Sequence, residues 1–166
     1  MALKEVTRLA LESSLTEPSA YTEIKRVLEG TGYEALPDAA ATIASTTTIA
    51  VCTADATSSR IITMPAAVAG TNLRVIWQVE QATSDRVFTC AGSDDIVGAI
   101  FTSKQSDSAG DGDVVAVTDG TIKITVVDDV NPGSYLDFHC AVAGQWIVTG
   151  QLVIDVVGSV PTIASS

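Results

Sequence analysis

The chain contains one histidine, His139, which follows Asp137 by two positions. An Asp–His pair can form part of a hydrolase relay, in which the carboxylate orients the imidazole and the imidazole activates a nucleophile. That chemistry also needs an activated nucleophile and an oxyanion site, and the sequence contains no G-x-S-x-G elbow or comparable motif. The two residues alternate with Leu136, Phe138 and Cys140. We therefore expect His139 to lie on a polar or subunit-facing surface and not in a catalytic site.

Three cysteines, Cys52, Cys90 and Cys140, are far apart in the chain, and each lies in a strand-like run. The sequence has no C-x-x-C spacing of the kind that zinc sites use. A redox or nucleophilic cysteine needs a basic neighbour that lowers its pKa, and the sequence offers little to supply one. We expect all three to be buried free thiols that act as small hydrophobic residues.

The acidic residues that are adjacent in sequence, Asp94 with Asp95 and Asp128 with Asp129, fall in predicted turns. Paired-carboxylate catalysis requires two groups that converge across a cleft, whereas neighbours on an extended chain point apart. The polar stretch 102–113 contains aspartates and glycines but lacks the register of an EF-hand calcium loop. We expect no metal, no cofactor and no enzymatic activity.

Length and charge limit the classes of protein further. A chain of 166 residues with 46% apolar residues can form one domain with a sizeable core. It carries 9 basic and 20 acidic residues, a formal net charge of −11, so binding to nucleic acid or to an anionic membrane is disfavoured. Residues 1–14 have no uninterrupted apolar stretch, which indicates neither a secretory signal nor a membrane span, and we expect the protein to fold in a cytoplasm.

Residues 1–32 have the pattern of two short amphipathic helices. Apolar residues recur at helical spacing in both segments, with charged residues mostly on the opposite faces. The helices either cover an edge of a sheet or form an arm that docks on another subunit or protein. The expected partner contacts of this helical arm are Leu3, Val6, Leu9, Tyr21, Ile24 and Leu28.

Residues 33–160 are predicted to form a β domain. Short runs with a period of two, such as Leu73, Val75 and Trp77, are separated by Gly, Asp, Ser and Pro turns and give eight to ten strands. Asp119–Gly120 is a hairpin-type dipeptide, although a longer turn is an alternative, and two last strands are expected around Gly150. The predicted fold is mainly β, an antiparallel β-sandwich or jelly-roll-like domain, followed by a frayed tail at 161–166.

Several predicted strands carry apolar residues on both faces, for example Ile61 beside Ile62 and Val153 beside Ile154. A sandwich buries only one face of each sheet internally, so a second apolar face predicts coverage by the N-terminal helices or by neighbouring subunits. We expect a homo-oligomer, specifically a homotrimer. The two tryptophans, Trp77 and Trp146, fall on alternating apolar faces and are expected in the core.

The strand and turn series also resembles a pattern in virion proteins of tailed bacteriophages. The matching segments cover roughly residues 45–150, and Met64 stands where Leu is more usual before the proline of the first segment. The segments are SRIITMPAA, TNLRVIWQ, RVFTCAGSDDIVG, GTIKITVV and GSYLDFHCAVAGQWIVTG.

The resemblance implies a structural protein of the virion surface, because such modules occur in head decoration (cement) proteins, head fibres and tail fibres, typically as trimers. We expect a capsid decoration protein that binds the major capsid protein, or another virion protein, on the outer surface of a phage head and stabilises the shell. It would be made in the host cytoplasm and located on the virion. The alternative is a fibre or spike component that binds a host receptor or glycan.

Overall fold

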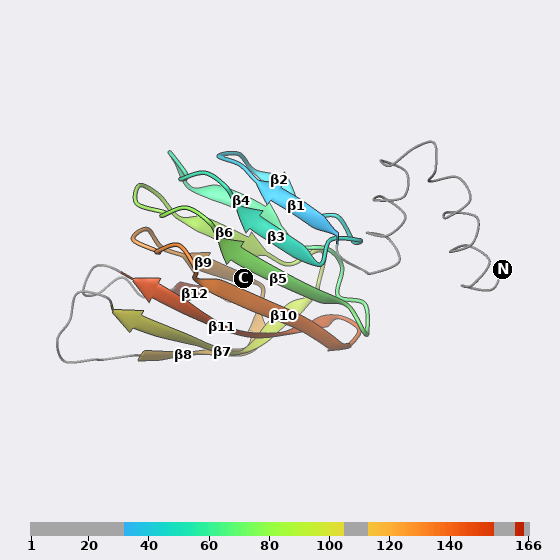
Figure 1. Ribbon diagram of the computed structural model, residues 1–166. Helices are drawn as coiled ribbons and strands as arrows, with labels where there is room; N and C mark the ends of the chain where they lie inside the picture. The colour runs from blue at the N-terminus through green and yellow to red at the C-terminus, as the bar shows by residue number, and fades with distance from the viewer. Residues whose placement is uncertain (1–31, 105–112, 155–161, 165–166) are drawn as a thin grey trace, which may run out of the picture. The chain divides into compact units, whose positions relative to one another are not determined.

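The structure is a computed structural model that describes residues 32–104, 113–154 and 162–164. These residues form twelve strands, and no helix lies among them (Figure 1). The prediction of a mainly β fold is therefore confirmed. The helical arm and its six expected contact residues lie outside the described residues. The division into an arm of residues 1–32 and a β domain of residues 33–160 stays a prediction.

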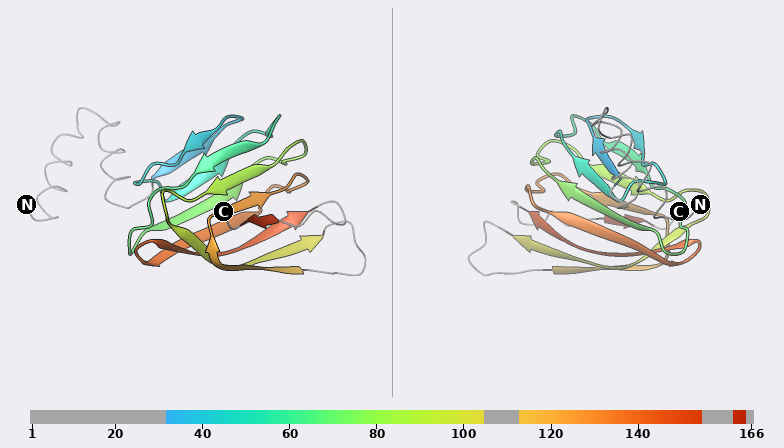
Figure 2. Two further views of the ribbon diagram at one scale, coloured as in Figure 1. Left: turned by 180° about the vertical axis from the view of Figure 1, so that it is seen from behind. Right: turned by 45° about the vertical axis from the view of Figure 1, so that its right-hand side comes forward.

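The strands form two sheets that pack face to face (Figures 1 and 2). The seven-stranded sheet, called sheet A here, has the order β1 (Tyr33–Leu36), β3 (Ile49–Cys52), β5 (Asn72–Trp77), β10 (Tyr135–Val142), β11 (Gln145–Ile154), β7 (Asp95–Lys104) and β8 (Asp113–Thr121). The five-stranded sheet, called sheet B, has the order β12 (Thr162–Ala164), β9 (Lys123–Val126), β6 (Arg86–Thr89), β4 (Arg60–Thr63) and β2 (Ala41–Thr42).

The first six strands alternate between the two sheets. Strands β1, β3 and β5 are parallel neighbours in sheet A, and β2, β4 and β6 are parallel neighbours in sheet B. Each connection between parallel neighbours therefore passes through the opposite sheet, so this part of the chain winds as a coil of three turns. The register stacks equivalent positions of the three turns, with Leu36 beside Cys52 and Cys52 beside Trp77.

The remaining strands extend both sheets mainly in antiparallel fashion. In sheet A, β10 is antiparallel to both β5 and β11, and β7 is antiparallel to β8. In sheet B, β9 is antiparallel to both β6 and β12. The pair of β11 with β7 in sheet A is parallel. Both sheets are thus mixed, and the prediction of an antiparallel sandwich or jelly roll is wrong in strand direction. A period of two shows which side chains face the core, but it carries no information on the direction of the neighbouring strand.

Three local predictions also change. Strand β11 runs without a break from Gln145 to Ile154, so Gly150 lies inside one strand and does not separate two. Asp119 and Gly120 form no hairpin turn, because β8 continues through them to Thr121 and the chain then crosses to β9 in sheet B. The expected frayed tail at 161–166 contains strand β12, which pairs with β9.

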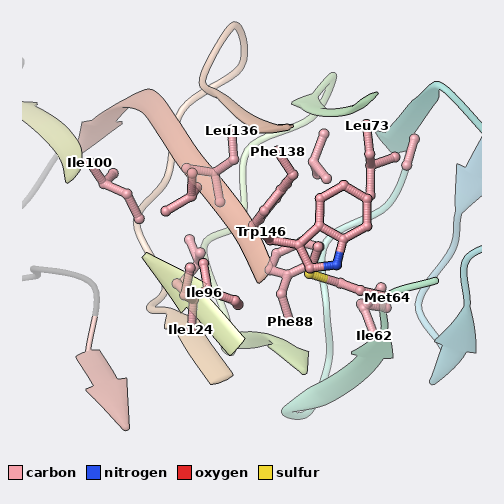
Figure 3. Packing of buried hydrophobic residues seen from close by; sticks show 14 of the residues in the cluster. Ile62, Met64, Leu73, Phe88, Ile96, Ile100, Ile124, Leu136, Phe138 and Trp146 are labelled. Atoms are coloured by element: carbon pink, nitrogen blue, oxygen red, sulfur yellow. The ribbon is translucent and has the colours of Figure 1, made fainter. Parts of the chain in front are cut away.

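One core lies between the sheets. Four aromatic side chains cross it in sequence: Trp77 contacts Phe88 with ring centroids 6.0 Å apart, Phe88 contacts Phe138 at 6.3 Å, and Phe138 contacts Trp146 at 6.4 Å. Ile62 and Ile124 from sheet B pack with Leu73, Ile100 and Leu136 from sheet A in the same cluster (Figure 3). Both tryptophans are fully buried, as predicted.

Candidate functional site: the outer face of the seven-stranded sheet

The three cysteines are buried free thiols, as predicted. Burial raises the pKa of the Cys52 thiol to about 12, although the nearby Arg86 guanidinium acts in the opposite direction. Burial, reinforced by the charges of Asp94 and Asp95, raises the pKa of Cys90 to about 12, and burial also raises the pKa of Cys140. All three thiols are therefore held in the unreactive protonated form at neutral pH.

Asp137 and His139 both lie on the outer face of sheet A, and His139 is exposed there, as expected for a polar surface. The Asp137 carboxylate accepts two hydrogen bonds from Arg74, from Nε and Nη2, each 2.6 Å long. The His139 Nδ1 atom lies 2.6 Å from Oδ1 of Asn72. Arg74 also lies over the ring of Tyr135, with its Cζ atom 5.1 Å from the ring centroid. Asp137 therefore pairs with Arg74, and His139 pairs with Asn72 instead of with Asp137.

The acidic residues that are adjacent in sequence bind different parts of the fold. Asp94 accepts a hydrogen bond of 2.7 Å from the backbone N–H of Ala67, whereas Asp95 accepts from the backbone N–H of Gly120 and the side chain of Gln145. Within the described residues, no group of three or more His, Cys, Asp or Glu side chains could hold a metal ion.

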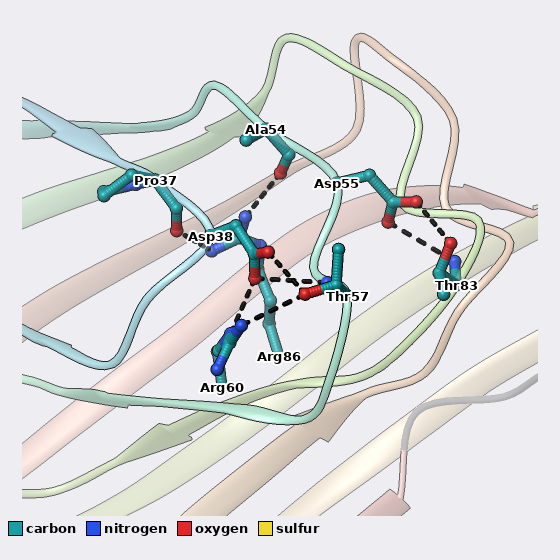
Figure 4. Close-up of polar contacts among 8 residues, drawn as sticks. All are labelled: Pro37, Asp38, Ala54, Asp55, Thr57, Arg60, Thr83 and Arg86. Carbon is teal, nitrogen blue, oxygen red and sulfur yellow. Dashed lines mark hydrogen bonds and ion pairs between the residues drawn. The ribbon is translucent and has the colours of Figure 1, made fainter.

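A second polar region connects the turns between the two sheets (Figure 4). The Asp38 carboxylate, after β1, accepts hydrogen bonds from Thr57 and from Nε of Arg60, which lies 2.6 Å away. The Arg60 hydrogen bond, followed by that of the Thr57 hydroxyl, lowers the pKa of Asp38. Asp55, after β3, likewise accepts from the backbone and hydroxyl of Thr83 after β5. These hydrogen bonds join the turn after β1 to the segment after β3, and they join that segment to the turn after β5.

Arg86 is fully buried beneath the same turns. Its Nη1 donates to the carbonyl of Pro37 at 3.3 Å and its Nη2 donates to the carbonyl of Ala54 at 2.5 Å, while its Nε has no hydrogen-bond partner among the described residues. The sequence does not indicate this role, because a basic residue at the start of a strand is usually solvent-exposed. The sequence signal that could have indicated polar links between the turns is the recurrence of Asp and Thr after successive strands. These residues position the turns through their hydrogen bonds.

The outer face of sheet A is the candidate functional surface, because its composition is unusual for a solvated sheet. Four of the exposed large hydrophobic residues lie on it, namely Tyr33, Phe101, Val114 and Ile147. Phe101 and Val114 are directly opposite each other on β7 and β8 and are 55% and 58% exposed. This pair was not among the sequence-based predictions, although both strands have adjacent apolar residues, Ile100 with Phe101 and Val114 with Val115.

Searches against protein-family models, curated proteins and solved structures each return no match to this chain. Among the described residues there is also no helix with the length and apolar character required to cross a lipid bilayer.

Proposed function

We propose that this protein is a structural component of a bacteriophage virion, a capsid decoration or cement protein that forms a homotrimer and binds the outer surface of the head. The observation that carries the proposal is the apolar outer face of sheet A, which the described residues leave open. Contiguous exposed apolar residues on a folded protein are typical of surfaces that another protein covers. The similarity of residues 45–150 to the strand and turn pattern of phage virion proteins supports the same class.

The proposed action is thermodynamic and needs no catalytic group. A protein that binds only the assembled shell stabilises the shell by mass action, by roughly 2.7 kcal/mol per site at a free concentration of 100 times Kd. Many equivalent sites on one head add their contributions. The shell contacts are assigned to the helical arm, through Leu3, Val6, Leu9, Tyr21, Ile24 and Leu28, with the major capsid protein as partner.

The test is to add the purified full-length chain to heads that lack it. We expect saturable, stoichiometric co-sedimentation and a higher melting temperature of the heads in calorimetry. A variant with Val6→Asp and Leu9→Asp should lose binding, whereas Glu5→Gln with Arg8→Gln, charged residues of the same segment, should retain it. Absence of binding by the unmodified chain, or binding without any change in melting temperature, would reject the cement role.

A fibre or spike component that binds a host receptor or glycan is the second candidate. The observation that favours it is the polar strip on β5 and β10, where Arg74 lies over the Tyr135 ring and its guanidinium is held by Asp137. An aromatic ring beside fixed hydrogen-bonding groups can bind a sugar. Binding to a glycan array or to host cells that is lost in Tyr135→Ala, without binding to heads, would favour this candidate over the cement protein.

A further inference from the structure

The exposed apolar side chains of the β unit are concentrated at one end. Strands β1 and β5 begin at this end, called the loop end, and β10, which is antiparallel to β5, ends there (Figure 1). Eight large hydrophobic side chains are exposed among the described residues, and five of them belong to the loop end: Tyr33, Val68, Ile122, Val142 and Ile147. The turns at the opposite end, where Asp38 and Asp55 form hydrogen bonds, contain none of the eight.

Two loops, called the loop pair, carry the most exposed of these side chains. They are residues 65–71, which precede β5, and residues 140–144, which include the turn from β10 to β11. Val68 and Val142 are 59% and 69% exposed, the two largest values among the exposed large hydrophobic residues. Apart from one threonine and one cysteine, the loop pair contains only Ala, Val, Gly and Pro. Such side chains lose little rotamer freedom when a partner covers them.

Hydrogen bonds hold the two loops against each other. The Ala67 carbonyl accepts from the N–H of Gly144 at 2.9 Å, and the Cys140 carbonyl accepts from the N–H of Gly70 at 2.7 Å, so each exposed valine lies between the two bonds. The Asp94 carboxylate also accepts from the N–H of Ala67 at 2.7 Å. The apolar surface is therefore formed before any partner binds, which lowers the entropic cost of association.

Polar side chains border the loop pair. Asp95 and Asp119 both accept from the side chain of Gln145, the residue that follows the second loop. His139, which precedes that loop, pairs with Asn72, which follows the first one. An apolar centre with a polar rim is the usual arrangement of a protein–protein interface. Because part of the rim is acidic, exposed apolar area and not charge distinguishes this end.

We propose that the loop end docks on the shell protein that the arm binds, with the loop pair at the centre of the contact. This inference rests on the proposed function and adds a second contact to it. Leu28, the last expected contact of the arm, precedes Tyr33 by five residues. Five residues span at most about 17 Å, so a partner that holds Leu28 lies within that distance of the start of β1, whatever the conformation of the arm. The apolar surface at that end of the unit is the loop end.

Two contacts on one partner reinforce each other. Once the arm is bound, the loop pair meets the shell at an effective concentration set by the short connection, typically in the millimolar range. A loop contact that is weak by itself therefore still adds to the affinity of the whole chain.

The test measures the affinity of the full-length chain for heads that lack it, by co-sedimentation over a range of concentrations. Val68→Asp and Val142→Lys place charges of opposite sign in the loop pair. Ile61→Asp and Ile61→Lys are the matched controls on the outer face of sheet B, because Ile61 is 54% exposed. We expect Kd to rise at least ~30-fold for both loop variants, since each would bury an unpaired charge in the contact, and to be unchanged for both controls.

The opposite signs separate a direct contact from long-range attraction. A contact penalises either charge, whereas long-range attraction is weakened by one sign and strengthened by the other. Weaker binding by one loop variant with tighter binding by the other would therefore overturn the inference. Tryptophan emission and the urea midpoint of each variant should match those of the unmodified chain, because both valines lie outside the core.

Maleimide labelling of Val68→Cys distinguishes the possible occupants, since the native thiols are buried. We expect fast labelling in the free chain and slow labelling on the heads, whereas Ile61→Cys labels fast in both. Slow labelling in a free monomer would mean that another segment of the same chain covers the loops, and slow labelling in a free oligomer would mean that a second copy does. Either result contradicts the inference.

The same experiment separates the inference from the proposed function. Binding of the unmodified chain that both loop substitutions leave unchanged overturns the inference and leaves the cement role intact. An unmodified chain that does not bind heads rejects the cement role, and the inference with it.

Discussion

Gly98 lies in β7 directly beside Val148 of β11, and the backbones approach so closely there that a side chain does not fit. A Cβ atom added at Gly98 would lie 2.0 Å from the Val148 carbonyl oxygen, and the φ angle of Gly98 is 137°. Gly150 is in a similar position, because its Cβ would lie 2.4 Å from the carbonyl oxygen of Tyr135. The central strands of sheet A therefore depend on residues without side chains at these two points.

Gly98→Ala is expected to destabilise the fold by at least ~3 kcal/mol, because backbone atoms of β11 must move in addition to the unfavourable φ. Gly92→Ala is the control, since Gly92 also has a positive φ, 59°, but has open space around it. Gly92→Ala should lower the free energy of unfolding by about 1–2 kcal/mol, which is the cost of the left-handed backbone conformation alone. Urea unfolding measures both values. Equal losses of stability would show that the close approach at Gly98 is unimportant.

The cysteine thiols lead to a prediction about reactivity. With the pKa of Cys52 and Cys90 raised to about 12, the thiolate fraction at pH 8 is roughly 1 in 10,000. We expect the native reduced protein to react with a disulfide reagent far more slowly than free cysteine does, and all three thiols to react at once in denaturant. A native thiol that reacts as fast as free cysteine would contradict this and would restore a nucleophilic or redox role.

At the scale of the elements, the parallel strands require connections that cross between the sheets, and polar side chains hold these connections together. Asp38 links the turn after β1 to the segment between β3 and β4, and Asp55 links that segment to the turn after β5. Arg86 of β6 donates to carbonyls in two of the same turns. The coil of β1–β6 is therefore fixed at this end by hydrogen bonds as well as by its core.

The Asp38 interaction predicts a dependence of stability on pH. Its pKa in the folded protein lies below the ordinary value of 3.8, so its contribution to stability is complete above that value. As the pH falls below 3.8, the unfolded chain takes up the proton first and the contribution is lost. The melting temperature of Asp38→Asn should therefore be lower than that of the unmodified protein near pH 6, and this difference should shrink near pH ~2.5.

Asp128→Asn is the control for this experiment, because it removes the same charge from a different turn. It should not reproduce the pH-dependent difference of Asp38→Asn. A gap between Asp38→Asn and the unmodified protein that stays constant from neutral to acid pH would indicate that ionisation of Asp38 contributes nothing to folding.

At the scale of the whole β unit, a single core joins the coil of β1–β6 to the strands that follow it. The aromatic series begins at Trp77 in β5, passes through Phe88 of sheet B and ends at Trp146 in β11. Because each ring contacts the next, loss of packing at one end removes neighbours from the other. We therefore expect the unit from Tyr33 onward to unfold cooperatively.

Two single-tryptophan variants test this cooperativity. Trp77→Phe leaves Trp146 as the fluorescent reporter, and Trp146→Phe leaves Trp77. Each substitution lowers the midpoint of urea unfolding, but the slope m should be the same in both, because m scales with the surface exposed and the same unit unfolds in each case. Clearly different slopes would mean that the two ends of the core unfold as separate units.

The burial of individual side chains could be predicted well from sequence. The period of two in Leu136, Phe138 and Cys140 matches their burial, and His139 lies on the opposite, exposed face. Strand partners could not be predicted, because an apolar alternation fits a parallel or an antiparallel neighbour equally well. The ion pair of Arg74 with Asp137 was likewise inaccessible, since it joins residues 63 positions apart that meet only through the pairing of β5 with β10.

The sequence by itself determined the mainly β character of the described part, the inward side of most strands and the burial of the cysteines and tryptophans, because these follow from local alternation and from the transfer of apolar side chains out of water. The tertiary structure alone decided the mixed sheets, the coil of β1–β6, the burial of Arg86 and the apolar outer face of sheet A. Each of these depends on which strands become neighbours, and pairing between distant segments is a property of the whole chain and not of any local pattern.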